Sequence, residues 1–469
     1  MATASAAALA GLWRLLDQPE AALSRVTLSG AEPALPSSFA VGTAAQASIA
    51  ASALAAAELD RLRSGREQRV SVDMRHAAVE FRSERYLRVD GGPAPELWDS
   101  IAGTYRCGDG RWVRLHTNFP HHRDGVLAIL GCAGEREAVA ESLKGWKAED
   151  FEQKAAGAKL VVTAMRSFAE WDAHPQGQAV AALPLMSLEK IGEAPPLSLP
   201  PGERPQGNRP LSGVRVLDLT RIIAGPVGGR TLAAHGADVL LVTAPHLPSV
   251  EPLVIDTGRG KRAAQLDLRK ADDSARFEAL LRGANVLIQG YRPGGIGSLG
   301  FGPEQAAAIR PGIVYVTLSA YGHEGPWAGR RGFDSLVQTA SGLNVAEAEA
   351  AGIDGPKPLP AQALDHASGY LMAYGAMAAL ARQMREGGSW HVRVSLAQTG
   401  RWLRGLGRLE GGLAAPDPSQ ADVADLLEET PSGFGWLTAV RHAGILSETP
   451  PRWERPSMPL GSHQPVWPD

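Results

Sequence analysis

One acidic residue stands among small and apolar residues and could do chemistry. Asp365 lies in residues 361–369, at the start of a long apolar stretch, residues 370–385, that ends at two glycines with arginines in its last turns. This pattern indicates a helix that begins near Asp365. Unpaired backbone N–H groups at a helix start favour a carboxylate by roughly 0.3–1 kcal/mol, so we expect Asp365 to stay ionised. Such a carboxylate can cap the helix, act as a base or act as a nucleophile.

Basic and aromatic side chains follow several expected strands. Thr220-Arg221 follows residues 214–219, Tyr291-Arg292 follows residues 285–289, and a basic segment occupies residues 258–262. Continuous apolar strands joined by helices indicate a parallel sheet covered on both faces, whose ligands bind at the carboxyl ends of the strands. Basic groups there suit an anionic, phosphate-bearing ligand. A solvated charged loop is the other interpretation. The expected strands are residues 214–219, 237–242, 285–289 and 313–318.

A glycine pattern in residues 295–300 imitates a dinucleotide-binding motif. These residues read Gly-Ile-Gly-Ser-Leu-Gly and follow a strand. Arg292-Pro293 stands between the strand and the glycines, and Thr243 rather than an acid follows Val242 at the end of the second strand. The motif needs glycines directly after the first strand and an acid for the ribose, so we expect no dinucleotide site.

The composition indicates a soluble globular protein. The chain has 469 residues, of which 44% are hydrophobic and 21% charged, and its net charge of −3 gives no reason to expect nucleic acid. Cys107 and Cys132 have no metal-ligand spacing, which predicts no metal site and fits a reducing cytoplasm. The apolar run at residues 47–57 is too short to span a bilayer, so we expect a cytoplasmic protein with no membrane segment.

The pattern divides the chain into five parts around a proline-rich linker. Six prolines and few large apolar residues lie between residues 193 and 210, which predicts a stiff, extended segment. The fold class that we expect is α/β, with a parallel-sheet, Rossmann-like large domain and a smaller α+β domain. The parts are an N-terminal helical segment (residues 1–90), the small domain (91–193), the linker (194–210), the large domain (211–405) and a proline-rich surface tail (406–469).

Part of the chain is repeated. Residues 43–74 align without gaps with residues 365–396, so that Arg63 matches Arg385 and Gly65 matches Gly387. The position that matches Asp365 is Thr43, which has no carboxylate. We therefore expect the first copy to be a degenerate repeat of the helix that follows Asp365.

Several dispersed motifs together resemble the family III coenzyme A (CoA) transferases, the CaiB/BaiF family. The resemblance implies that Asp365 is the catalytic aspartate and that CoA is bound by the strand-end loops. The order of the parts departs from this family, so the chain looks circularly permuted or fused. The motifs are residues 211–221, 224–226, 236–239, 259–262, 266–268, 291–294 and 319–322, and the implied CoA contacts are Arg221, Ala224, Arg262, Leu266, Arg269, Tyr291 and Arg292.

The implied activity is the transfer of CoA from an acyl-CoA thioester to a carboxylic acid, through an aspartyl anhydride and an aspartyl-CoA thioester. No cofactor is expected to be bound permanently, and a homodimer is possible. Two alternatives stay open. One is a 2-methylacyl-CoA racemase, although that branch has a Gly-His-Asp sequence where this chain reads Gly332-Phe333-Asp334. The other is a non-catalytic partner subunit.

Overall fold

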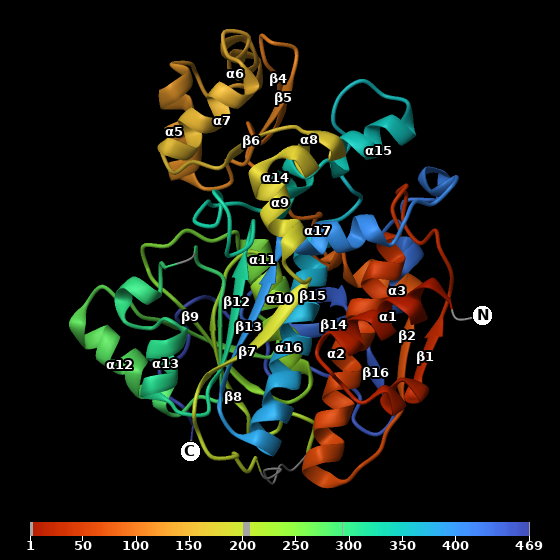
Figure 1. The fold of residues 1–469 in the computed structure, drawn as a ribbon, viewed down its shortest axis with the longest axis vertical. Helices are drawn as coiled ribbons and strands as arrows, with labels where there is room; N and C mark the ends of the chain where they lie inside the picture. The colour runs from red at the N-terminus through yellow and green to blue at the C-terminus, as the bar shows by residue number, and fades with distance from the viewer. Residues whose placement is uncertain (1–2, 200–206, 293, 469) are drawn as a thin grey trace.

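The structure is a computed structural model that describes residues 3–199, 207–292 and 294–468. A seven-stranded sheet forms its centre (Figure 1). Neighbouring strands are parallel except β7, which runs antiparallel to β13 at one edge. This sheet confirms the predicted α/β class. In spatial order the strands are β10 (Lys261–Gln265), β9 (Asp238–Thr243), β8 (Arg215–Leu219), β11 (Val286–Gln289), β12 (Val314–Ser319), β13 (Ser389–Ser395) and β7 (Met186–Gly192).

Helices cover both faces of this sheet, which is why its central strands, such as β11, are mostly apolar. Val216 and Val316 point to one face and belong to one core with α10 and α16. Leu217 and Leu287 point to the other face and share a second core with α12 and α13. Alternate residues of each strand therefore enter different cores. The helices around the sheet are α10 (Ala224–Ala234), α11 (Glu251–Thr257), α12 (Ala271–Arg282), α13 (Pro303–Ile309) and α16 (Ala363–Glu386).

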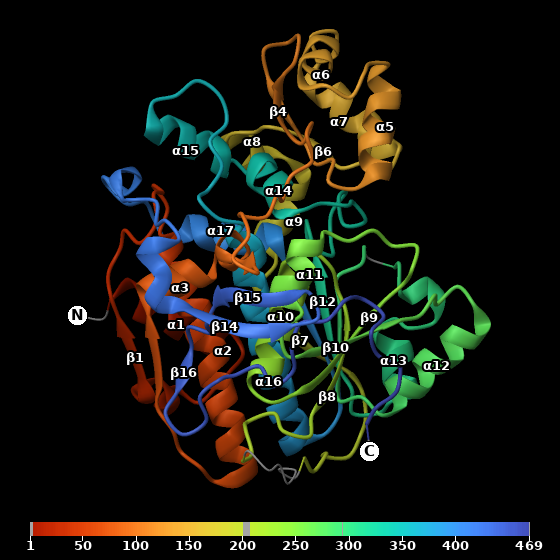
Figure 2. The same ribbon diagram turned by 180° about the vertical axis from the view of Figure 1, so that it is seen from behind.

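Two helices of equal length pack side by side next to the sheet. α2 (Val41–Ser64) and α16 each have 24 residues and contact each other along their length, as Figure 1 and Figure 2 show. α2 begins and ends 322 residues before α16. β2 (Val70–Asp73) and α3 (Met74–Glu80) follow α2 as β13 and α17 (Leu396–Gly405) follow α16. The repeat in the sequence is thus also a repeat of structure.

A small α+β unit stands apart from the sheet, at the top of Figure 1. Its three strands are antiparallel, and its own core includes Val113 and Phe151. A hairpin turns at Asp109-Gly110, where Gly110 has φ +80°. The elements are β4 (Gly103–Arg106), β5 (Trp112–Leu115), β6 (Val162–Ala164), α5 (Pro120–Leu130), α6 (Arg136–Leu143) and α7 (Ala148–Gly157).

The small unit ends before the boundary expected at residue 193. α8 (Phe168–Ala173) and α9 (Pro175–Ala182) lead back to the large domain, where β7 pairs with β13. This pairing covers what would otherwise be an open sheet edge with unpaired backbone groups. The last strand of the range 91–193 therefore belongs to the large sheet.

The two ends of the chain meet in small sheets, so residues 406–469 are more than a surface tail. Strand β16 pairs with β2, and the hairpin of β14 and β15 pairs with β3. Residues 1–90 likewise contain strands as well as helices. The strands are β1 (Val26–Ser29), β3 (Arg88–Val89), β14 (Leu427–Ser432), β15 (Gly435–Val440) and β16 (Ile445–Leu446). The remaining α-helices are α1 (Ala4–Leu15), α4 (Ser83–Tyr86), α14 (Asp334–Ala340) and α15 (Leu343–Ala351).

The predicted linker lies partly outside the described residues, since residues 200–206 are not described. Its described ends are anchored by backbone contacts. On one side, the N–H of Gly388 donates to the carbonyl of Ala194, and the Arg63 guanidinium donates to the carbonyl of Leu199. On the other side, the same guanidinium donates to the carbonyl of Pro210. Among the described residues, no helix is both long and apolar enough to cross a membrane.

Candidate functional site

A cavity of about 390 Å³ lies at the carboxyl ends of the parallel strands. Leu219 and Thr243, the last residues of β8 and β9, line one wall. Phe119, His121 and His122, at the start of α5, close the cavity from the small unit. Ligands of open parallel sheets bind at this edge, so the cavity lies where the strand pattern predicted a ligand.

Five of the seven predicted CoA contacts line this cavity: Arg221, Leu266, Arg269, Tyr291 and Arg292. The Arg221 guanidinium lies 5.3 Å from the centre of the Phe119 ring and 5.8 Å from that of Tyr291. It also donates to the carbonyl of Pro248 at 2.8 Å. Arg221 is therefore held in one place by groups on both sides of the cavity.

The other two predicted contacts are used by the fold itself. Ala224 is buried at the start of α10, where its carbonyl lies so close to Gly369 of α16 that a Cβ there would be 2.5 Å from it. Arg262 is buried too, donates to Asp238 at 3.2 Å and also hydrogen-bonds the carbonyl of Val466. Neither is among the described residues that line the cavity.

The basic segment at residues 258–262 is neither a solvated loop nor a cavity wall. Lys261 is buried and donates to Asp218 and to a backbone carbonyl, each at 2.8 Å. Arg259 is buried against Asp256 at 2.9 Å, and its guanidinium lies 4.1 Å from the centre of the Trp453 ring. Each cation of this segment thus has a buried carboxylate partner, so the segment is not solvated.

A cation that the sequence pattern did not single out joins Arg221 and Arg292 at the cavity. Arg331 lines it, and burial followed by the charges of Arg292 and Arg221 lowers the pKa of its guanidinium. The three arginines are thus close enough to repel one another. The carboxylate of Asp267, which also lines the cavity, accepts a hydrogen bond from the Arg269 guanidinium at 2.8 Å. The arrangement suits a ligand with several negative charges.

Backbone strain marks the loop between β8 and α10. Ile222 lines the cavity and has φ +75°. A β-branched residue rarely adopts this left-handed conformation, and such strain clusters at functional sites. It occurs here directly after Arg221, at the cavity wall.

Asp365 is the third residue of α16 and only 6% exposed. Its backbone N–H donates to Oδ2 of Asp334 at 2.9 Å, and the N–H of Leu364 donates to the same atom at 2.8 Å. Of the described residues, none donates a hydrogen bond to the Asp365 carboxylate. The main chain is thus fixed by Asp334 while the side chain stays unbonded.

The surroundings of Asp365 oppose the ionisation that its helix start was expected to favour. Burial raises its pKa well above the usual value, and the nearby carboxylates of Asp334 and Glu84 raise it further. Burial also raises the pKa of Asp334 to about 6. The helix start contributes roughly 0.3–1 kcal/mol in the opposite direction, which is too little to offset burial beside two acids.

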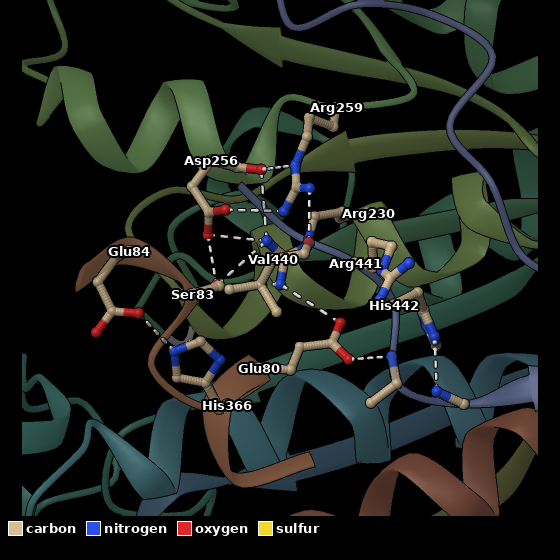
Figure 3. Close-up of polar contacts among 12 residues, drawn as sticks. Glu80, Ser83, Glu84, Arg230, Asp256, Arg259, His366, Val440, Arg441 and His442 are labelled. Atoms are coloured by element: carbon tan, nitrogen blue, oxygen red, sulfur yellow. Dashed lines mark hydrogen bonds and ion pairs between the residues drawn. The ribbon is translucent and has the colours of Figure 1, made fainter. Parts of the chain in front are cut away.

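Glu84 reaches Asp365 from the N-terminal part of the chain. Its Oε2 lies 3.0 Å from Nε2 of His366, and both side chains are buried. The neighbouring Ser83 donates to Asp256 at 2.7 Å, and Arg230 donates to the same carboxylate at 2.8 Å, in the buried network drawn in Figure 3. This network fixes α4 against the large domain, so the N-terminal part of the chain contributes Glu84 to the surroundings of Asp365.

The cavity and Asp365 are joined through one short segment. Phe333 lines the cavity, and the next residue, Asp334, accepts the N–H of Asp365. The Phe333 ring also stacks on His116 of the small unit, with centroids 3.9 Å apart. In the described part of the chain, Asp365 is not among the residues that line the cavity, and it lies behind this segment.

A family model described as CoA-transferase family III matches residues 11–198 and 211–419. The chain belongs to this family. The interruption between the two matched segments falls within the proline-rich linker, and α2 and α16 lie in different segments. The predicted relationship to family III CoA transferases is therefore confirmed.

The proteins most usefully compared with this chain match only part of it. An acyl-CoA transferase of Gibberella moniliformis is 28% identical over 370 residues, which are 70% of this chain and 64% of that protein. A succinate–glutarate CoA-transferase of Agrobacterium fabrum is 31% identical over 212 residues, 41% of this chain and 52% of that protein. The chain thus spans less than two thirds of either relative. The crystal structure of a CaiB/BaiF family protein from Brucella suis is 25% identical, covers 49% of this chain and 65% of that chain, and has a TM-score of 0.37.

Four residues of the site were missed in the sequence: Arg331, Asp334, Glu84 and His122. Asp334 and Arg331 had a signal, because Asp334 belongs to the Gly332-Phe333-Asp334 sequence that was compared with Gly-His-Asp and Arg331 directly precedes that sequence. Glu84 and His122 had none. They lie 281 and 243 residues before Asp365, and only the folded chain brings them to the site.

Proposed function

We propose that this protein transfers CoA from an acyl-CoA thioester to a carboxylic acid, with Asp365 as the nucleophile. The observation that carries this proposal is the buried Asp365 carboxylate, which no described residue hydrogen-bonds although its own N–H is fixed by Asp334. A carboxylate that served only as a helix cap would accept backbone N–H groups itself. Here Asp334 does that, and Asp365 is left free to react.

The reaction conserves acyl activation at every step. An Asp365 oxygen attacks the acyl carbon of the donor, the C–S bond breaks, and a mixed anhydride and CoA thiolate result. The thiolate then attacks the Asp365 carbonyl carbon, which releases the donor acid and leaves an aspartyl-CoA thioester. The acceptor carboxylate attacks that thioester and expels the thiolate. The thiolate attacks the acceptor acyl carbon, which forms the new acyl-CoA and regenerates Asp365.

The surroundings of Asp365 support this chemistry. Burial limits access of water, which would otherwise hydrolyse the anhydride and the thioester. The arginines at the cavity suit the phosphates of CoA, with Arg221 held in place by Pro248. A carboxylate acceptor agrees with the name of the succinate–glutarate relative, which specifies two carboxylic acids.

A single chain provides both sides of the cavity. The sheet contributes Leu219 and Tyr291, and the small unit contributes Phe119 and His122. The buried network also brings Glu84 from the first part of the chain to His366 in the second. We propose that the chain is a fused arrangement in which each chain carries one complete site. A homodimer stays a prediction.

Racemase chemistry receives less support. It needs a proton-transfer group at the place of Phe333, whose ring has no exchangeable proton and is stacked on His116. The inactive-subunit alternative conflicts with an unbonded Asp365 behind a cationic cavity.

The experiment is a screen of acyl-CoA donors against a panel of mono- and dicarboxylates, with new thioesters detected by mass spectrometry. The proposal predicts at least one donor and acceptor pair that yields a new thioester with the wild type and none with Asp365→Asn. Turnover by Asp365→Asn at the wild-type rate would refute the role of Asp365. Racemised donor without any new thioester would favour the alternative.

A further inference from the structure

His122 is a buried histidine whose function the fold does not explain. It lies in the first turn of α5, is 3% exposed and lines the cavity. Neither of its ring nitrogens has a hydrogen-bond partner. A buried polar group without a partner costs about 1–3 kcal/mol, so such groups are rare unless a ligand or water completes them.

The charged groups around His122 are cations. Burial, followed by the charges of His121, Arg331 and Arg221, lowers its pKa to about 3. The pKa of His116, the residue after β5, lies well below its usual value, mainly because of burial and in smaller part because of Arg114 and His122. The ring of His122 is therefore neutral near pH 7, with one nitrogen that can donate a hydrogen bond and one that can accept.

We infer that His122 binds the phosphate-bearing part of the CoA thioester from the small-unit side of the cavity. The inference rests on the proposed function. A phosphate oxygen accepts the imidazole N–H, and it is attracted by Arg221 and Arg331 beside the same ring. Binding places an anion among these cations, so it also favours the imidazolium form, which donates from both nitrogens.

This contact links the two parts of the chain through the ligand. Arg221 and Arg292 belong to the large domain, whereas His122 belongs to α5. The three side chains face one cavity from opposite sides. A ligand held by all three bridges the small unit and the sheet, and the site then depends on how the small unit is docked.

The test measures direct binding of unacylated CoA by isothermal titration calorimetry, so that it does not depend on turnover. We compare the wild type with His122→Phe, which keeps the ring volume, and His122→Gln, which keeps a donor and an acceptor. The control is His235→Phe. His235 is also fully buried with both ring nitrogens unpartnered, but it is not among the described residues that line the cavity.

We expect His122→Phe to weaken CoA binding about tenfold, His122→Gln to weaken it less, and His235→Phe to leave it unchanged. Repeating the titration with 3′-dephospho-CoA identifies the phosphate. A loss confined to CoA assigns His122 to the 3′-phosphate, and an equal loss with both ligands assigns it to the diphosphate. In the wild type, histidine side-chain NMR should show the His122 signal move when CoA is added, which holds even if His122→Phe fails to fold.

Two results overturn this inference. One is wild-type affinity in His122→Phe while Arg221→Ala binds CoA more weakly, which leaves the proposed function standing. The other is an unchanged His122 NMR signal at saturating CoA. Absence of CoA binding by the wild type would instead refute the proposed function itself.

Discussion

The starts of α2 and α16 are built alike and differ in the one side chain that could react. The residue before each helix has nearly the same backbone angles, φ −76° and ψ 61° at Ala40 and φ −77° and ψ 62° at Gln362. In each, a carboxylate from an earlier segment accepts the N–H of the third helical residue. Glu32 does so for Thr43 at 2.5 Å, and Asp334 does so for Asp365 at 2.9 Å.

The surroundings of the two starts have diverged. Gly42 leaves room for the Glu32 carboxylate, because a Cβ at Gly42 would lie 2.8 Å from Oε2 of Glu32. The Thr43 hydroxyl is buried and has no partner. At α16, by contrast, Asp334 directly follows a residue of the cavity wall. Both copies thus have a carboxylate that caps the helix, whereas only the α16 copy has the aspartate that we propose as the nucleophile.

The largest difference between the two copies should appear in turnover. Asp365→Ala removes the proposed nucleophile and should lower the rate of CoA transfer by at least about 10³-fold. Thr43→Ala removes a hydroxyl that bonds nothing and should stay within about twofold of the wild type. Steady-state kinetics with circular dichroism as a check of folding measures both. A large loss in a folded Thr43→Ala protein would show that the first copy also takes part.

The second difference concerns the cavity, which lies next to the start of α16 and not next to the start of α2. Arg221→Ala should weaken CoA binding by about 1.5–3 kcal/mol, the usual contribution of a charge-assisted hydrogen bond. Arg262→Ala should leave CoA affinity unchanged and lower the melting temperature, because it frees the buried Asp238 from one of its partners. Calorimetric titration at low salt separates the two. Equal losses of affinity would return Arg262 to the binding site.

The third difference concerns the two caps. Asp334→Ala and Glu32→Ala each remove the acceptor of helix-start N–H groups and should cost about 0.5–2 kcal/mol of stability. Only Asp334→Ala should also lower kcat, by about tenfold to a hundredfold, because it releases the main chain of the nucleophile. Denaturant unfolding and kcat, measured for both variants, test this. If kcat stayed at the wild-type value in Asp334→Ala, its carboxylate would be only structural.

The smallest effect is on stability and follows from the raised pKa of Asp365. The folded chain holds this proton more tightly than the unfolded chain, so wild-type stability falls as the pH rises from the ordinary aspartate range through the raised pKa. Asparagine cannot ionise. Asp365→Asn should therefore melt about 1–3 °C higher than the wild type at pH 8, with the gain vanishing towards pH 4. Thr43→Val should show no such pH dependence, and a destabilised Asp365→Asn at pH 8 would contradict the raised pKa.

Much of the fold could be predicted from local pattern. The burial of strands such as residues 285–289 can be read from their continuous apolar sequence. The gapless repeat likewise relates the position of one 24-residue helix to that of the other. Pairings between distant segments could not be predicted. β7 pairs with the edge strand β13 of the large sheet, and β16 pairs with β2. Each pairing covers a strand edge that would otherwise be open, and the local sequence does not show which distant segment will do so.

The site was predictable where its residues follow strands, as with Arg221 and Tyr291. The site was not predictable where burial decides whether a side chain faces the cavity or is ionised. Arg262 has the type and position of a ligand contact, yet Asp238 on the neighbouring strand binds it. Asp365 was expected to be ionised from its own helix, but Asp334 and Glu84 come from segments remote in the sequence.

The measurement that tests the central claim most directly is covalent trapping on the wild type. The protein is incubated with a substrate acyl-CoA and hydroxylamine, which converts an aspartyl anhydride or thioester into an aspartyl hydroxamate, and peptides are mapped by mass spectrometry. Our account predicts one modified site per chain, at Asp365, and no modification of the peptide that contains Thr43. A chain that turns over substrate while Asp365 stays unmodified, or that is modified at two sites, would contradict it.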